Sequence, residues 1–128
     1  MTLKEAPGAV RRGMKAAEKA AWLSKSPSHR VGAAIFKGTK LVSYGWNSRK
    51  SHPRSHTIQK GHHAEFAALM ANWKYDLIGA TIYVTRLTRG GNIGIAAPCK
   101  ECRKLIEACG LKRVVFTNRE GEVEEWRL

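Results

Sequence analysis

The chain has 128 residues, of which 43% are hydrophobic and 26% are charged, as expected for one globular domain spanning residues 1–128. No apolar run approaches the roughly 20 residues of a membrane span, and residues 1–12 lack the apolar stretch of a secretory signal, so we expect neither a membrane protein nor an exported one. The net charge is +13, and the charged residues are unevenly distributed along the chain. Residues 1–60 hold 13 Lys and Arg against 2 acidic residues, whereas residues 61–128 hold 10 against 8. Such a field attracts phosphate, on a nucleotide or along a nucleic acid backbone.

The spacing of apolar residues predicts three helices and five strands, in the order helix, two strands, helix, strand, helix, two strands. The predicted helices are 8–25, 63–74 and 100–109, with Gly110 as the last helix's terminating glycine. The predicted strands are 31–36, 41–46, 80–87, 113–117 and 122–128. Short turns join the first two strands and the last two, so we expect two hairpins and a last strand that is antiparallel to its neighbour. The order predicts an α/β layered domain.

Two motifs contain residues suited to binding a metal. One is His63-Ala64-Glu65, and the other is the segment 98–102, which contains Cys99 and Cys102; each motif begins a predicted helix. One imidazole and two thiols suit a catalytic zinc ion, which typically has three protein ligands and a fourth position for water. A helix N-terminus favours the thiolate form of cysteine. Glu65 could take a proton from the water and pass it on.

Neither motif is specific when it stands alone. A histidine at a helix start is often only a polar residue, and Cys-x-x-Cys also occurs in redox proteins, in zinc fingers and as core thiols. A redox pair is disfavoured because the motif does not follow the first strand of a thioredoxin-like unit. A zinc finger lacks a nearby fourth ligand, since Cys109 lies inside a predicted helix and is most simply a core residue. The joint pattern, His-x-Glu followed by a strand and Pro-Cys-x-x-Cys, is a signature of zinc deaminases.

On these motifs the chain resembles the cytidine and deoxycytidylate deaminase superfamily over about residues 28–118. Four further segments resemble strands of that family: 30–35, 45–47, 81–85 and 110–115. The resemblance implies a cytidine-deaminase-like three-layer fold, with a mixed five-stranded sheet and helices on both faces. It also implies that His63, Cys99 and Cys102 bind one Zn²⁺ per chain. The implied reaction is hydrolytic: a water activated by the metal attacks the carbon bearing the amine, Glu65 transfers the protons, and ammonia leaves.

The resemblance also implies contacts with the substrate. Asn47 would contact the ribose or deoxyribose, the backbone N–H of Ala64 would hold the base, and Ala33 lies on a small-residue strand that borders the pocket. The chain departs from the common nucleotide-acting members in the segment 86–97, which separates the third strand from the cysteine motif. There Arg86 and Arg89 add positive charge, either in a solvated loop or in a phosphate-binding one. The segment that precedes His63 contains three more histidines, which are solvated, line the mouth of the site or supply extra metal ligands: His52, His56 and His62.

Three functions are consistent with these features. The first is deamination of a free cytosine nucleoside or nucleotide, with dCMP as the expected substrate. The second is deamination of a base in single-stranded DNA or RNA, bound by the basic N-terminal half with Trp22, Trp46 and the loop 49–60. The third is a zinc-stabilised binding module, which has no need of Glu65.

We expect the first function, because the chain has no additional recognition domain and ends in a predicted hairpin. With no export signal and three clustered cysteines, a cytoplasmic location is expected, or the host cytoplasm for a viral protein. Members of the superfamily are often homo-oligomers, and nothing in the sequence sets a subunit number.

Overall fold

The computed structural model describes residues 2, 4–25, 29–48, 63–71, 76–88, 93–94, 96–118 and 120–128. Its elements, in chain order, are α1 (Gly8–Ala21), β1 (His29–Lys37), β2 (Lys40–Trp46), α2 (Ala64–Ala71), β3 (Thr81–Thr88), β4 (Ile93–Gly94), α3 (Lys100–Ala108), β5 (Arg113–Thr117) and β6 (Val123–Arg127). Among these helices, none has the length and apolar character needed to cross a membrane.

The strands form one mixed sheet in the order β2-β1-β3-β5-β6. β3 and β5 are parallel, and the other paired strands are antiparallel. The five predicted strands and the antiparallel last strand are therefore confirmed. The structure adds β4, two residues that pair with Arg86 and Leu87 in a segment that we predicted to be a loop. Two residues are too few to show the alternation of apolar and polar side chains by which a strand is predicted.

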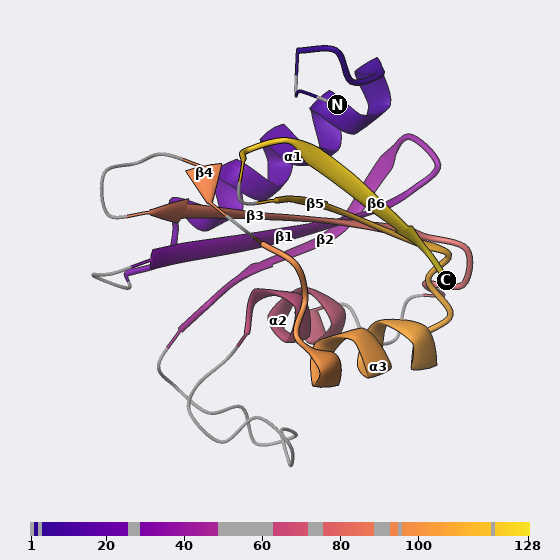
Figure 1. Cartoon of the computed structure of the whole chain (residues 1–128). Coiled ribbons are helices and arrows are strands. Elements are labelled where there is room, and N and C mark those ends of the chain that lie inside the picture. The colour runs from indigo at the N-terminus through magenta and orange to yellow at the C-terminus, as the bar shows by residue number, and fades with distance from the viewer. Residues whose placement is uncertain are drawn as a thin grey trace.

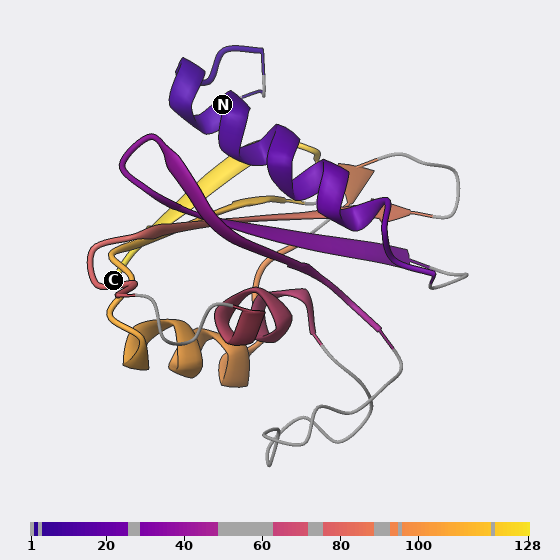
Figure 2. The same ribbon diagram turned by 180° about the vertical axis from the view of Figure 1, so that it is seen from behind.

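The helices cover both faces of the sheet. α1 lies on one face, and α2 and α3 lie together on the other (Figures 1 and 2). On β3, Tyr83 packs in the core beneath α1, whereas Ile82 and Val84 pack in the core beneath α2 and α3. This is the predicted three-layer arrangement.

The first helix is shorter than the prediction of 8–25, because α1 ends at Ala21. Leu23 and Ser24 donate backbone hydrogen bonds to carbonyls three residues earlier, which closes the helix with a tighter turn. The hydroxyl of buried Ser24 then donates to the carbonyl of Asn47 at 3.0 Å. This tertiary contact takes the chain away from the helix axis, and local periodicity does not reveal it.

The directions of three strands determine where α2 and α3 begin. β2 and β3 are each antiparallel to β1, so they run the same way, and β5 is parallel to β3. α2 connects β2 to β3, and α3 connects β3 to β5. Each helix is therefore a crossover connection that starts beyond the carboxyl end of a strand, and these strand ends share one edge of the sheet. Crossovers of one handedness place both helices on the same face, as Figure 1 shows.

Gly45 lets the backbone of α2 rest directly on β2. A Cβ at this position would lie 2.4 Å from the amide nitrogen of Ala68 and 2.8 Å from the carbonyl carbon of Ala67. Two residues earlier on β2, the hydroxyl of buried Ser43 donates to the carbonyl of the same residue, Ala68. The height of α2 above the sheet therefore depends on a position without a side chain.

We predict that Gly45→Ala lowers the free energy of unfolding by about 1–3 kcal/mol, because the methyl group meets backbone that cannot rotate away. Urea unfolding monitored by circular dichroism measures this. Gly8→Ala is the control, since a Cβ there meets only the tip of the Arg12 side chain at 3.4 Å. An unchanged unfolding midpoint for Gly45→Ala would contradict the close packing of α2 on β2.

Candidate metal centre

The three predicted ligands converge at the edge of the sheet where α2 and α3 begin. His63 immediately precedes α2, Cys99 immediately precedes α3, and Cys102 lies in the first turn of α3. His63 Nδ1 lies 3.6 Å from Cys99 Sγ and 3.3 Å from Cys102 Sγ. All three ligand atoms lie within 4.8 Å of one another. The structure thus brings together the residues that sequence reasoning proposed as one ligand set.

These distances suit a tetrahedral zinc ion. Bonds of about 2.3 Å to sulfur and about 2.0 Å to nitrogen place neighbouring ligand atoms about 3.6 Å apart. The observed nitrogen–sulfur distances of 3.3 and 3.6 Å are close to that value. Two thiolates and one imidazole are donors typical of zinc, and three protein ligands leave one position open.

The first turn of α3 holds the two thiols in place. Cys99 is the N-cap residue, and its Sγ accepts a hydrogen bond from the backbone N–H of Cys102 at 3.5 Å. The carbonyl of Cys99 accepts from the N–H of Arg103 at 2.9 Å. The two candidate ligands from this motif therefore also begin the helix.

Two acidic groups of the site, Glu65 and Cys102, are buried. Glu65, in the first turn of α2, is 5% exposed, and its burial raises its pKa to about 7. Burial also raises the pKa of the Cys102 thiol, and the nearby charges of Glu65 and Cys99 raise it further. A divalent cation would offset this cost by stabilising the thiolates. The donor set therefore fits a metal ion electrostatically as well as geometrically.

The predicted contacts for the base lie beneath α2 and α3, and the predicted contact for the sugar lies at the end of β2. Ala64 is the first residue of α2 and Ala33 lies on β1; both are fully buried in the core beneath α2 and α3. Asn47 follows β2, where its Oδ1 accepts from the N–H of Val31 at 2.9 Å and its Nδ2 donates to the carbonyl of His29 at 3.3 Å. Asn47 thus fastens the end of β2 to the start of β1. Its contact with a sugar stays a prediction.

Arg86 points toward the site layer. It is two residues beyond Val84 on β3, and alternate residues of a strand share a face, so its side chain lies on the side of α2 and α3. It is half-buried, and its Nε is buried with no hydrogen-bond partner among the described residues. Five other sequence-based candidates lie outside the described residues: Arg89, His52, His56, His62 and the basic loop 49–60. Trp22, which is exposed after the end of α1, and Trp46, at the end of β2, lie within them, and their contact with nucleic acid stays a prediction.

Sequence reasoning did not identify two contacts that hold the site. Phe66 of α2 packs against Cys102 across the two helices, and the guanidinium of Arg103 lies over the ring of Trp126. Phe66 belongs to the apolar residues that predicted α2, but their spacing does not indicate that Phe66 contacts a candidate ligand. Cys109 packs against the main core, as predicted, but it is half-buried rather than buried because it lies at the exposed C-terminal end of α3.

Comparison with known proteins identifies similar sequences and folds. The family model of the cytidine and deoxycytidylate deaminase zinc-binding region matches residues 9–118. A mouse deoxycytidylate deaminase is 32% identical over 108 residues, covering 73% of this chain and 55% of the mouse protein. The chain spans about half the length, or less, of the deoxycytidylate deaminases that it matches.

Two solved structures are similar over most of the chain. A cytidine deaminase from Burkholderia pseudomallei has a TM-score of 0.69 and 27% identity, covering 91% of each chain. A dCMP deaminase from the cyanophage S-TIM5 has a TM-score of 0.66 and 27% identity, covering 89% of this chain and 86% of the phage protein. The phage enzyme has also been crystallised in complex with dCMP and dUMP.

We predict that Cys102→Ser reduces the zinc content of the purified protein from about one ion per chain to nearly none, because a hydroxyl is a poor substitute for a thiolate ligand. Elemental analysis after desalting measures this. Cys109→Ser is the matched control and should retain zinc, since Cys109 lies beyond the last turn of α3, outside the ligand set. Full zinc retention by Cys102→Ser would contradict the assigned ligands.

Proposed function

The chain belongs to the family of the cytidine and deoxycytidylate deaminase zinc-binding region, and from this premise we propose that it hydrolyses the cytosine base of a free nucleotide, such as dCMP, to uracil. One observation carries the proposal: three zinc-type ligand atoms converge within 4.8 Å of one another beside a buried carboxylate. A structural zinc site needs a fourth ligand and no acid. A site with three ligands and an adjacent carboxylate suits hydrolysis.

The proposed reaction consumes one water and releases one ammonia. His63, Cys99 and Cys102 would hold a zinc ion, which would supply an activated water by lowering the pKa of that water to about 7. Glu65 accepts a proton from this water and donates it to the ring nitrogen as the new C–O bond forms at the carbon bearing the amine. Glu65 then transfers the second proton to the amine, the C–N bond breaks, and uracil and ammonia are released.

A free nucleotide as the substrate is supported by relatives and by charge. Similar proteins include deoxycytidylate deaminases and a phage enzyme crystallised with dCMP and dUMP. Arg86 lies at the carboxyl end of β3, facing the layer that contains the ligands, with a buried donor that has no partner among the described residues. A guanidinium with a buried N–H that lacks a partner can donate a charge-assisted hydrogen bond to a phosphate oxygen. We therefore assign the phosphate of the substrate to Arg86, with Arg89 as a second candidate.

The alternative substrate, a base in single-stranded nucleic acid, rests on the basic N-terminal half. Part of that charge is on α1, on exposed Arg11, Arg12, Lys15 and Lys19. α1 lies on the face of the sheet opposite to α2 and α3, so the sheet separates these cations from the candidate site (Figures 1 and 2). A nucleic acid strand bound along the α1 cations would have to pass around the edge of the sheet to bring a base to His63, Cys99 and Cys102. This separation favours the free nucleotide.

We predict that Glu65→Gln retains zinc and lowers kcat for cytosine deamination by at least about 100-fold, since positioned acid–base groups contribute about 10²–10⁴-fold. Ammonia release and zinc content are measured on the same preparation. Near-normal turnover by the zinc-loaded variant would contradict the proton-transfer role. Loss of both zinc and turnover would show that Glu65 is needed to form the site rather than to transfer protons.

We predict that Arg86→Met raises KM for dCMP by about 10- to 100-fold and leaves KM for deoxycytidine unchanged. Methionine retains an apolar stem, whereas a hydrogen bond to a charged group contributes about 1.5–3 kcal/mol. Steady-state kinetics with both substrates separate the effects, the nucleoside being the internal control. An equal change for both substrates would contradict phosphate recognition by Arg86.

A further inference from the structure

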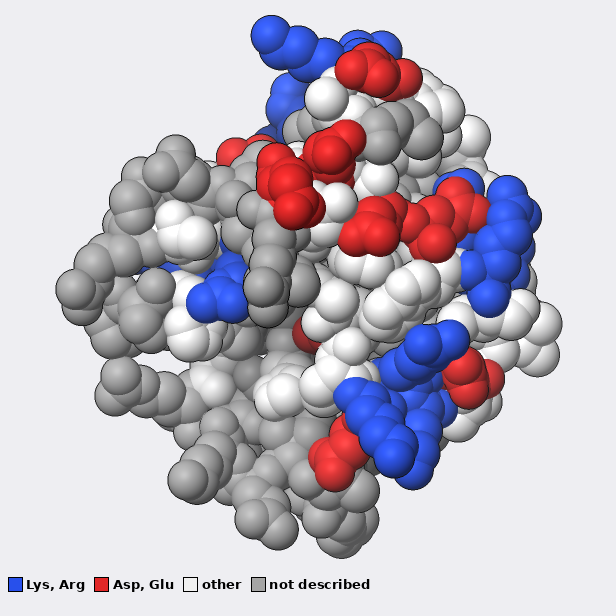
Figure 3. All heavy atoms as spheres, viewed as in Figure 1, with Lys and Arg blue, Asp and Glu red and all other residues white. Residues whose placement is uncertain are grey.

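α3 carries two of the three candidate ligands but has few anchors of its own. Of its nine residues, only Cys102 and Ile106 are buried. Ile106 packs in the core beneath the sheet, and Cys102 packs against Phe66 of α2. The exposed face of α3 is rich in charge, and Figure 3 shows its Lys and Arg side chains gathered there. The position of the first turn, which holds the thiols, therefore depends on contacts beyond this short apolar stripe.

One such contact joins α3 to the last strand. The Cζ atom of Arg103 lies 4.6 Å from the centroid of the Trp126 ring, within the range of a cation–π interaction. The Trp126 ring in turn meets Phe116 edge-on, with centroids 4.7 Å apart. Phe116 is buried in the main core, and Trp126 is half-buried against it. The ring of Trp126 is thus held by the sheet and presents one face to α3.

Arg103 connects this ring to the ligands. It directly follows Cys102 in the chain, and its N–H donates to the carbonyl of Cys99 at 2.9 Å, which closes the turn between the two thiols. Its Nε also lies 3.4 Å from Glu107 Oε1, one turn along the helix. A displacement of Arg103 would therefore move the turn that sets the separation of Cys99 and Cys102.

We propose that Trp126 and Arg103 are positioning residues of the metal centre: the ring of Trp126 holds Arg103, and Arg103 holds the first turn of α3 in the geometry that binds the metal. The inference rests on the proposed zinc site. β6, which bears Trp126, lies outside the residues 9–118 that match the family model. Partners that orient metal ligands typically change metal affinity by about 10- to 100-fold when removed.

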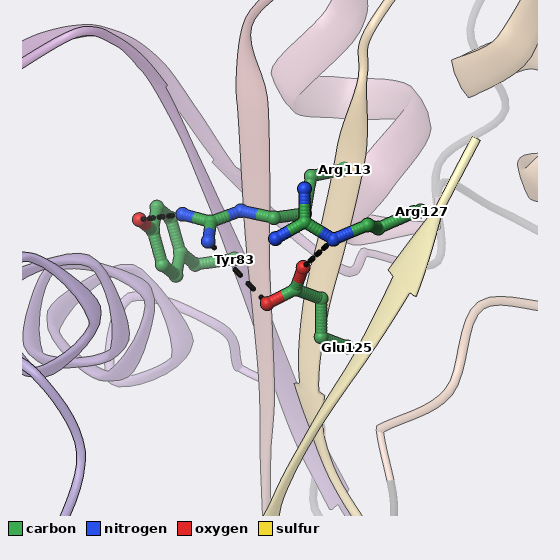
Figure 4. Close-up of polar contacts among 4 residues, drawn as sticks. All are labelled: Tyr83, Arg113, Glu125 and Arg127. Carbon is green, nitrogen blue, oxygen red and sulfur yellow. Dashed lines mark hydrogen bonds and ion pairs between the residues drawn. The ribbon is translucent and has the colours of Figure 1, made fainter.

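The hairpin of β5 and β6 carries a second network of contacts on the face opposite to Trp126. There Arg113 donates to the hydroxyl of Tyr83 at 3.2 Å and lies 3.4 Å from Glu125, which also pairs with Arg127 at 3.0 Å (Figure 4). This network joins β3, β5 and β6 on the side of α1. It stabilises the hairpin without contacting α3, so its loss should not change metal binding.

The test measures the Zn²⁺ dissociation constant by competition with a chromogenic chelator, together with the thiolate-to-metal absorption band of the Co²⁺-loaded protein. Arg103→Ala should weaken Zn²⁺ binding about tenfold and shift the Co²⁺ band, because the turn loses its support. Lys104→Ala is the matched control: it removes the same charge from the next residue of α3, which is exposed. Arg127→Ala is the control for the hairpin. Both controls should bind Zn²⁺ as the unaltered protein does.

Two variants of Trp126 complete the test. Trp126→Leu should weaken Zn²⁺ binding as Arg103→Ala does, and Trp126→Phe should restore most of the affinity because it retains an aromatic face. Combining Trp126→Leu with Arg103→Ala should cause no further loss, since both remove one interaction. Equal Zn²⁺ affinities for Arg103→Ala and Lys104→Ala, or fully additive losses in the double variant, would overturn the inference. Tight Zn²⁺ binding without deamination by the unaltered protein would overturn the proposed function alone.

Discussion

The shared direction of β2, β3 and β5 is the constraint on which the candidate site depends. His63 is 36 residues from Cys99 in the chain and reaches it only because α2 and α3 both begin beyond the carboxyl ends of strands that run the same way. Parallel strands require crossover connections, and crossovers of one hand place both helices on one face. Gly45 then allows the backbone of α2 to lie against β2, which sets the height of His63 and Glu65 above the sheet.

The chemistry of the site follows from placing acids where water is excluded. The thiol of Cys102 and the carboxyl of Glu65 are buried together, and their burial raises the pKa of each. The charge of Glu65 adds to the effect of burial on the Cys102 thiol, so the two groups are costly to ionise side by side. A divalent cation resolves the conflict, and the same low-polarity environment leaves Glu65 able to hold and release a proton near neutral pH.

Sequence reasoning succeeded where a local pattern determined the structure. Apolar periodicity predicted the three helices and five principal strands, and Gly110 adopts the positive φ of 81° expected for a glycine that ends a helix. The convergence of His63, Cys99 and Cys102 was predictable because each motif lies at a helix start, and their role as zinc ligands stays a prediction. β4, the early end of α1 and the contact of Arg103 with Trp126 were not predicted. Each depends on partners distant in the chain, and neither spacing nor composition encodes such pairs.

The central claim is that this site deaminates a free cytosine nucleotide. The most direct measurement compares deoxycytidine, dCMP and a cytosine-bearing single-stranded oligonucleotide side by side, with the zinc-loaded protein at low and moderate salt. We predict turnover of the monomeric substrates, with dCMP preferred. Turnover of the oligonucleotide alone, falling steeply as salt rises, would contradict the assigned substrate and indicate a nucleic acid substrate bound through the basic surface. No turnover of any of the three would contradict the activity itself.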